Sequence, residues 1–244
     1  MGEALIHIKP DDAKAVHSDF PLTRGVIPLP PESLMWSVGA RSVDRFLIAA
    51  DIWGQIIGPY LHPGCSILDL GCGCGRAARQ LLPNACVSRY IGVDVVPSSV
   101  QWCQHHIQSL WPQKATFYGY DLYSAEYNPA GKMQATELTF PCAIESVDLV
   151  IGASLFTHLL EPDARHYLRE TVRVLNRKGR AFLSIHTNPA QSARFSGTEA
   201  RIDIAPDYFV EIAGAAGLVP FREAFFTEHI GNPSAQLIFA FCKK

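Results

Sequence analysis

The chain has 244 residues, of which 48% are hydrophobic and 18% are charged, and its formal net charge is −2. These values fit one large globular domain with a substantial core, and they disfavour nucleic-acid binding through a broad basic surface. No apolar run approaches the roughly 18 residues of a membrane-spanning helix, and the N-terminus lacks a signal-peptide core. The seven cysteines have no framework spacing, which indicates reduced thiols. We therefore expect a cytoplasmic protein that binds neither nucleic acid nor membrane, and the sequence leaves its oligomeric state open.

Residues 1–40 form an N-terminal extension that contains five of the 17 prolines. Its proline-rich part, 23–31, should be extended, because proline forbids regular helix and disfavours it in the preceding residue. A disordered arm is one interpretation. The apolar side chains between 26 and 36 favour the other, in which the extension packs on, or forms a lid over, a core domain of residues 41–244.

The core domain begins with an amphipathic helix over 41–57, whose apolar residues recur at helical spacing. Short apolar strands then alternate with further helices. The strands are expected at 66–70, 90–93, 115–119, 147–152 and 181–185. The helices are expected at 77–82, 97–110, 162–175 and 206–216, with a short helical connection at 154–160. Gly179, as a left-handed residue, and Gly217 end the last two helices. The segments 219–226 and 236–241 can form a closing antiparallel pair.

Residues 122–145 interrupt this alternation. They are polar, show no clear period and include the turn-forming run Asn128-Pro129-Ala130-Gly131. We interpret this segment as a long loop or insertion, and loops of that length are usually functional or mobile.

The alternation predicts an α/β fold, Rossmann-like and doubly wound, with a seven-stranded sheet that is mostly parallel and has an antiparallel C-terminal strand. Ligands of such sheets bind beyond the carboxyl ends of the strands. Four polar residues follow the carboxyl ends of successive predicted strands and should line one rim: Asp69, Asp94, Asp121 and Ser154.

A glycine-rich loop follows the first of these strands, with Gly71, Gly73 and Gly75 at alternating positions. The dinucleotide fingerprint requires a small residue where this chain has Arg76, and Asp69 would place a negative charge where a pyrophosphate would bind. Asp69 instead suits a cationic ligand group. A phosphate-binding Walker loop is excluded, because no Gly-Lys-Ser or Gly-Lys-Thr follows.

Two further acids on the rim indicate an adenosine. Asp94 can accept hydrogen bonds from both ribose hydroxyls, and Asp121 can accept one from an exocyclic adenine amine. An adenosine that carries a positive group over the glycine loop fits S-adenosylmethionine (SAM), which has a sulfonium and an ammonium.

The same segments resemble class I SAM-dependent methyltransferases. The segments that carry the resemblance are Leu68–Arg76, Gly92–Asp94, Val147–Val150 and Arg173–Gly179. Further segments are similar to a small-molecule-type branch of that family: Pro30–Glu32, Val38-Gly39, Tyr127–Gly131, Leu138–Pro141 and Ser154–Leu159. The resemblance covers about residues 22–241, and it departs from the family where Arg180 follows Gly179 in place of a second glycine. It implies SAM as cofactor, with S-adenosylhomocysteine (SAH) as product.

The rim and the resemblance together predict which residues bind the cofactor. They are Asp69, Gly71, Cys72, Gly73, Gly75, Arg76, Asp94, Val95, Asp121, Leu122, Ala153, Ser154 and Trp36. Trp36 and Met35 are candidates to close over the sulfonium, with core packing as the alternative. Arg24 and Arg76 are candidate carboxylate contacts.

Methyl transfer needs alignment and exclusion of water more than a fixed catalytic residue, but a hydroxyl nucleophile requires a general base. His158 and His186 follow the fourth and fifth strands and are the candidate catalytic residues, with a purely structural histidine as the alternative for each. The cysteines at 65, 72 and 74 lack metal-binding spacing, so no metal is expected.

The function that these observations favour is SAM-dependent methylation of a small-molecule acceptor at oxygen or nitrogen. Pro141-Cys142 resembles the nucleophile pair of cytosine-C5 methyltransferases, but it precedes the fourth strand and would not lie on the rim. An Asn/Asp-Pro-Pro-Tyr motif for amino methylation is absent. Two alternatives stay open: an aminopropyl transferase on the same fold, for which the rim lacks extra acids, and a SAM-binding pseudoenzyme or scaffold.

Overall fold

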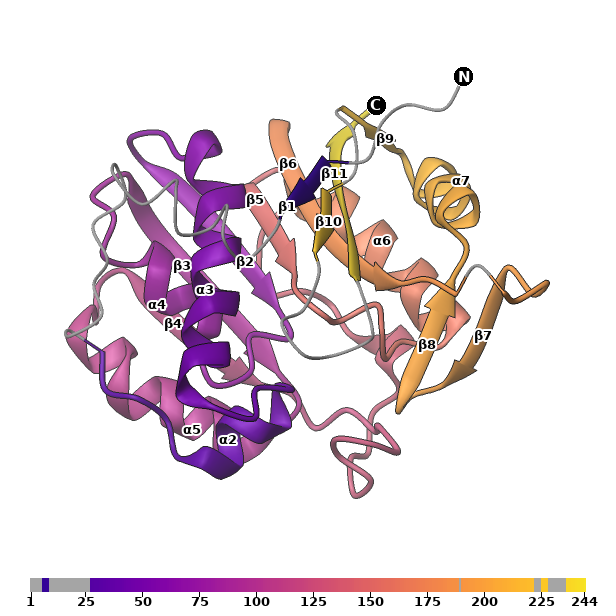
Figure 1. Cartoon of the computed structure of the whole chain (residues 1–244). Helices are drawn as coiled ribbons and strands as arrows, with labels where there is room; N and C mark the ends of the chain where they lie inside the picture. Colours follow the sequence, from indigo (N-terminus) through magenta and orange to yellow (C-terminus); the bar gives the residue numbers. More distant parts are fainter. Residues whose placement is uncertain (1–5, 9–26, 189, 222–224, 228–235) are drawn as a thin grey trace. The chain divides into compact units, whose positions relative to one another are not determined.

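The computed structural model describes residues 6–8, 27–188, 190–221, 225–227 and 236–244 (Figure 1). The chain divides into two compact units, which are considered separately. The glycine-loop unit comprises Ile8–Tyr120, and the C-terminal unit comprises Met1–His7 and Asp121–Lys244. A short strand, β1 (Ile6–Ile8), lies at the boundary in the sequence.

Three parallel strands form the centre of the glycine-loop unit. They are β2 (Cys65–Leu70), β3 (Val87–Asp94) and β4 (Ala115–Gly119). The helical segments are α2 (Glu32–Ser37), α3 (Val43–Ile57), η1 (Gly58–Tyr60), α4 (Arg76–Leu81), α5 (Pro97–His106) and η2 (Gln108–Leu110). Helix α3 packs against α4, and α5 packs against β3 and β4. Every residue of β2 is buried, as expected for a strand with both faces covered.

Local residues fix where the helices of this unit begin. Ser42 has an extended backbone and caps α3, its hydroxyl accepting a hydrogen bond from the Arg45 amide at 3.2 Å. The helix therefore starts at Val43, two residues after the predicted start. Pro97 opens α5, where its fixed φ suits the first helical position.

The C-terminal unit contains a second group of paired strands (Figure 1). Strand β5 (Val147–Gly152) pairs in parallel with β6 (Leu175–His186), and β11 (Gln236–Lys243) pairs antiparallel with β6. The shorter strands are β7 (Phe195–Thr198), β8 (Arg201–Ile204), β9 (Leu218–Pro220) and β10 (Phe225–Thr227). Helices α6 (Glu161–Val174) and α7 (Pro206–Ala216) pack on each other. The predicted fold class, α/β with mostly parallel strands and an antiparallel C-terminal strand, is confirmed.

Two local predictions for this unit are wrong. The predicted helical connection at 154–160 forms turns instead. The Thr157 hydroxyl donates to the Ser154 carbonyl, and the His158 amide donates to the Leu155 carbonyl. The next helix, α6, starts only at Glu161. Gly179 is not left-handed but lies within β6. Its lack of a side chain matters for another reason, since a Cβ there would lie 2.9 Å from the backbone oxygen of Asp148.

The predicted antiparallel pairing of the segments 219–226 and 236–241 is confirmed. Strands β9 and β10 both pair antiparallel with β11, and residues 222–224 lie outside the described residues. The β7–β8 hairpin was not predicted at all. Its turn requires Gly197, which has φ +119° and whose Cβ would lie 2.0 Å from the backbone oxygen of Arg201.

Residues 122–145 form an ordered loop, as predicted, with one short helical turn, η3 (Ala135–Glu137). A parallel bridge pairs Leu122 with Met133, and the side-chain amide of Asn128 donates to the Leu122 carbonyl at 2.9 Å. Because a Cβ at Gly131 would lie 2.1 Å from that carbonyl oxygen, only glycine fits the closed end of this loop.

Candidate functional site

The glycine loop connects β2 to α4 with a backbone that strongly favours glycine. Gly71, Gly73 and Gly75 have φ values of +67°, +52° and +82°, in the left-handed region. A Cβ at Gly73 would lie 2.4 Å from Cγ1 of Val38, and one at Gly75 would lie 2.2 Å from Cδ1 of Ile107. The loop is therefore held closely from two sides while its backbone amides stay near the start of α4.

Asp94, at the carboxyl end of β3, is bonded to this loop. Its Oδ2 accepts a hydrogen bond from the Gly73 amide at 2.7 Å, and its Oδ1 accepts one from the Val96 amide at 2.8 Å. Burial raises the pKa of Asp94, and these backbone bonds oppose the rise. Each carboxylate oxygen has a further lone pair, so the half-buried group can still accept from two ribose hydroxyls.

Asp69 lies one strand away and is only 1% exposed. The Tyr90 hydroxyl donates to its Oδ2 at 2.5 Å. Burial raises the pKa of Asp69 to about 7, against the opposing effects of Tyr90 and Arg76. The predicted interaction of Asp69 with a cation therefore requires a carboxyl group that titrates near neutral pH.

Part of the N-terminal extension packs on the loop. The Arg76 guanidinium donates to the carbonyl of Val38 at 3.1 Å, and Arg79 donates to the carbonyls of Pro28, at 2.9 Å, and Ile27. To contact a ligand carboxylate as predicted, the Arg76 guanidinium would have to share or give up its bond to the Val38 carbonyl. Arg24, the other candidate, lies outside the described residues.

The two residues predicted to close over the cofactor lie in different environments. Met35 is buried in a cluster with Ala40, Phe46 and Cys74. Trp36 is 49% exposed, and the Arg41 guanidinium lies 5.7 Å from its ring centroid. Trp36 therefore exposes part of its aromatic ring to solvent, whereas the side chain of Met35 is buried.

Cysteines surround the loop and fill space in it. Cys72 is 3% exposed, and the Cys103 thiol donates to the Gly73 carbonyl at 3.4 Å. The contact with Cys103 and burial hold the pKa of Cys72 well above its ordinary value, so its thiol is protonated at neutral pH. Val95, between Asp94 and the start of α5, is half-buried.

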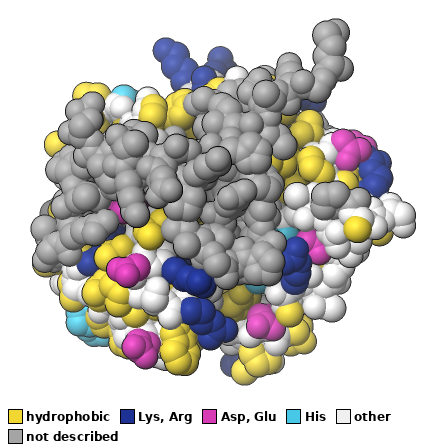
Figure 2. Space-filling model, viewed as in Figure 1, with side chains coloured by type: hydrophobic (Ala, Val, Ile, Leu, Met, Phe, Trp, Pro, Cys, Tyr) yellow, Lys and Arg dark blue, Asp and Glu magenta, His cyan; other side chains and the backbone are white. Residues whose placement is uncertain are grey.

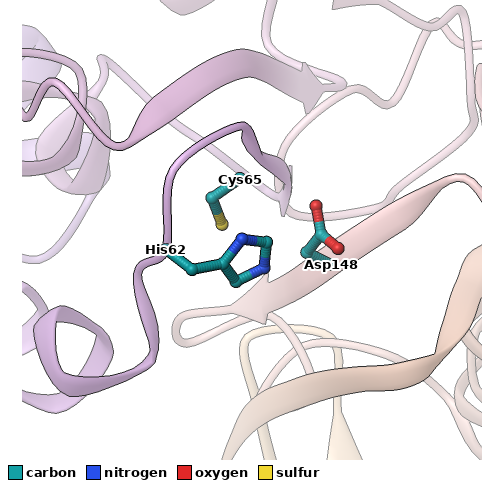
Figure 3. Close-up of side chains that lie close together, drawn as sticks. All are labelled: His62, Cys65 and Asp148. Atoms are coloured by element: carbon teal, nitrogen blue, oxygen red, sulfur yellow. The ribbon is translucent and has the colours of Figure 1, made fainter.

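His62, Cys65 and Asp148 belong to residue types that bind metals, and each of them makes a hydrogen bond to another protein group. Figure 3 shows His62 and Cys65 at the turn into β2, together with Asp148 of β5 in the C-terminal unit. A His62 ring nitrogen lies 3.2 Å from the Pro63 carbonyl, the Cys65 amide donates to the His62 carbonyl, and Asp148 accepts from Asn176. We assign no metal to these residues, and the absence of a metal remains a prediction.

The remaining predicted cofactor residues belong to the C-terminal unit. The side chain of Asp121 is exposed and Leu122 is buried, while Ala153 and Ser154 follow β5. Ser154 has φ +59°, a strained conformation for a residue other than glycine and one that is enriched at functional sites. Its amide donates to the Ser184 hydroxyl at 2.7 Å, which helps to hold this conformation.

His158 lies four residues after Ser154 and contacts two other segments. Its Nδ1 is 2.7 Å from the backbone oxygen of Glu199, and its Nε2 is 3.0 Å from the Tyr127 hydroxyl. Burial lowers the pKa of His158, against the opposing effect of its bond to Glu199. His186, the other candidate, is buried at the end of β6.

Residues 68–183 match a family model described as "Methyltransferase domain". This match identifies residues 68–183 as a methyltransferase domain. The enzyme class is therefore methyltransferase, and its cofactor is SAM.

Solved structures similar to this methyltransferase include 1,6-didemethyltoxoflavin-N1-methyltransferase from Burkholderia thailandensis, bound to 1,6-didemethyltoxoflavin and SAH. It has 18% identity and a TM-score of 0.63, with 100% of this chain and 93% of that chain covered. A TehB-like SAM-dependent methyltransferase from Corynebacterium glutamicum has 17% identity and a TM-score of 0.56, with 97% and 100% covered. A SAM-dependent methyltransferase from Leishmania major has 13% identity and a TM-score of 0.61, with 95% and 82% covered. These similarities show the Rossmann-like fold.

The surface of the methyltransferase leaves the partner predictions open. Figure 2 shows acidic and basic side chains among hydrophobic ones on the described part of the face that it draws. Among the described residues, no helix has both the length and the apolar character that crossing a membrane requires. The cytoplasmic location and the absence of nucleic-acid binding stay predictions.

The sequence predicted site roles for Asp69 and His158, which stay predictions, but it did not indicate three residues that bond to them. Tyr90, Tyr127 and Glu199 each bond to a predicted residue that is distant in sequence. Tyr127 stood in a segment that carried the family resemblance, which is the only signal that could have directed attention to it.

Proposed function

We propose that this chain transfers the methyl group of SAM to a small organic acceptor at oxygen or nitrogen. The observation that carries the proposal is the bond between the Gly73 amide and Asp94, which holds the left-handed glycine loop beside a carboxylate with spare acceptor capacity. The neighbour from Burkholderia is named for methylating N1 of a small molecule, and this supports an acceptor of similar size.

SAM, when bound, supplies an electrophilic methyl group whose sulfonium leaving group becomes neutral. The chain's own residues would then bind and orient. Asp94 would accept from the ribose hydroxyls, the amides of the glycine loop would lie along the amino-acid portion, and Asp69 in its ionised form would favour the positive charge. Trp36, Cys72, Val95, Asp121, Leu122, Ala153 and Ser154 complete the proposed cofactor site.

His158 is the proposed general base on the acceptor side. It follows the carboxyl end of β5, the end of the strand at which open α/β sheets bind their ligands. His186 stays a second candidate at the end of β6.

Calorimetric titration with SAH tests the cofactor site. Asp94→Ala removes both backbone bonds and the ribose acceptors, so affinity should fall at least about 30-fold, or 2 kcal/mol. Asp44→Ala, at an exposed position in α3, is the matched control and should bind like the parent. No SAH binding by the parent would contradict the proposal.

Transfer of tritium-labelled methyl groups from SAM into a desalted small-molecule cell extract tests the acceptor class. We expect labelled small molecules with the parent and none with Asp94→Ala. Binding of SAH with no transfer would favour the pseudoenzyme, and consumption of decarboxylated SAM would favour the aminopropyl transferase.

A further inference from the structure

Helix α2 has a well-defined C-terminal end. The Ala40 amide donates to the Met35 carbonyl at 2.9 Å, and the Gly39 amide donates to the Trp36 carbonyl at 3.0 Å. Gly39 has φ +77°, and Ala40 lies in the same buried cluster as Met35, so these bonds form a Schellman motif. The motif ends the helix and leaves the carbonyl of the next residue, Val38, to other donors.

This helix is too short to be stable by itself. It has six residues, Glu32–Ser37, and Met35 is the one among them that is buried. The N-cap residue, Pro31, has no side-chain acceptor for the first amides. Isolated helices of this length do not persist in water, because nucleation costs more than one turn of hydrogen bonds returns. The free energy that orders α2 must therefore come from the groups on which it packs.

Those groups belong to the glycine loop and to the start of α4. The Cys74 thiol, which is buried, donates to the Leu34 carbonyl at 3.4 Å. The Arg76 guanidinium donates to the Val38 carbonyl at 3.1 Å. The Val38 side chain lies directly against Gly73, because its Cγ1 is 2.4 Å from the position that a Cβ would take there. The C-terminal end of α2 thus docks on the loop through two hydrogen bonds and one close apolar contact.

The contact of Val38 with Gly73 reaches the proposed cofactor site through one hydrogen bond. The Gly73 amide donates to Oδ2 of Asp94 at 2.7 Å, and Asp94 is the proposed acceptor for the ribose hydroxyls. On its other side the loop is limited by Ile107, whose Cδ1 is 2.2 Å from the position of a Cβ at Gly75. Undocking of α2 would remove one of these two walls and let the Gly73 amide leave the carboxylate.

We propose that Val38 is a positioning residue of the cofactor site, and that docking of α2 and binding of SAM strengthen each other. This inference rests on the proposed function and deepens it, because it gives α2 control over cofactor affinity. Docked α2 holds Gly73 on Asp94, so the carboxylate meets the ribose in a fixed orientation. Linked equilibria are reciprocal, so a cofactor that fixes Asp94 must favour docked α2 by the same factor.

Hydrogen exchange measured by mass spectrometry tests the linkage in the parent protein. Backbone hydrogen bonds protect four amides in the peptide 31–40, those of residues 34, 35, 39 and 40. Because these bonds form only when α2 is docked, their exchange reports the docking equilibrium. Saturating SAH should slow exchange of this peptide at least about fivefold.

Gly39→Ala perturbs docking without touching the glycine loop. Alanine is strained at φ +77°, and its methyl group would meet no atom within 4 Å. Exchange of the peptide 31–40 without SAH should therefore quicken about tenfold, and saturating SAH should slow it again. Gly214→Ala is the matched control, since its methyl group also meets no atom within 4 Å and its φ is not left-handed. It should leave exchange of the peptide unchanged.

Calorimetric titration tests Val38 itself. Val38→Ala removes the methyl group that lies against Gly73 and should weaken SAH binding about tenfold. Leu29→Ala is the matched control, because Leu29 is 41% exposed in the same extension, and it should bind SAH like the parent. Methylthioadenosine keeps the ribose and the adenine but lacks the amino-acid part. Its affinity should fall by a similar factor in Val38→Ala, because the effect passes through Asp94 to the ribose.

The outcomes separate the two proposals. A parent that does not bind SAH contradicts the proposed function itself. A parent that binds SAH with unchanged exchange of the peptide 31–40 contradicts only the linkage, and so does parent-like SAH affinity in Val38→Ala. Weaker binding of SAH but not of methylthioadenosine in that variant would overturn the positioning role of Val38 at the ribose end.

Discussion

The buried pair of Asp69 and Tyr90 makes the stability of this protein depend on pH in a defined direction. Asp69 has its pKa raised from 3.8 to about 7, mainly by burial. The folded state therefore holds a proton on this carboxyl group at pH values at which the unfolded chain has released it. By linkage, the contribution of this group to the free energy of unfolding falls as pH rises between the two pKa values.

The size of this effect follows from the two pKa values. A shift of about three units corresponds to a ceiling of about 4 kcal/mol, of which about 3 kcal/mol falls between pH 5 and pH 8. Asp69→Asn cannot titrate and should remove this part of the pH dependence. Other groups titrate in both proteins, so the difference between them isolates Asp69.

Urea unfolding of the parent and Asp69→Asn at pH 5, 6, 7 and 8 measures that difference. The stability of the parent relative to the variant should fall by about 3 kcal/mol over this range and level off above pH 7. Placing an amide against Tyr90 also changes the free energy of unfolding, but by the same amount at every pH, so it appears as a constant offset between the two profiles. Parallel pH profiles would refute the reasoning, because they would mean that Asp69 has an ordinary pKa in the folded protein.

Three further outcomes are expected. Gly73→Ala should lower the free energy of unfolding by about 2–4 kcal/mol in urea titrations, because φ is +52° and the new methyl overlaps Val38. Adding Val38→Ala to this variant should recover about 1 kcal/mol. If the effects of the two substitutions on the free energy of unfolding simply added, the contact between residues 73 and 38 would be contradicted. Gly179→Ala should destabilise by about 1–3 kcal/mol through its approach to a backbone oxygen, and a loss below about 0.5 kcal/mol in the same titration would count against it. SAH affinity measured by calorimetry should rise up to about tenfold from pH 6 to pH 8 as Asp69 ionises. Asp69→Asn should abolish this pH dependence. If the rise in affinity persists in the variant, a group other than Asp69 causes it.

The order of elements could be predicted from the sequence because hydrophobic periodicity and glycine or proline punctuation are local signals. The strand limits of β4 and β5 and the loop with its acid at Asp94 all follow from such signals. Gly179 shows the limit of this reasoning. Its position after a helix suggested a left-handed cap, whereas the structure uses its missing side chain to let β6 pass the backbone of Asp148.

The partners of the predicted residues could not be predicted in the same way. The contact of Tyr90 with Asp69 depends on the lateral register of two parallel strands, in which Asp69 pairs with Gly92. The contacts of His158 come from residues 31 and 41 positions away, and one of them is a backbone carbonyl that has no sequence signature. A backbone acceptor can be located only once the chain is folded.

Arg76 and Arg79 bond residues 27–38 to α4 through main-chain carbonyls. Every amino acid offers the same carbonyl, so these bonds do not depend on which side chains the segment carries. Buried side chains such as Met35 still constrain the segment through their packing. Sequence drift is therefore expected at the exposed positions of the segment, whereas a change at either arginine removes bonds that no side-chain replacement within the segment can remove.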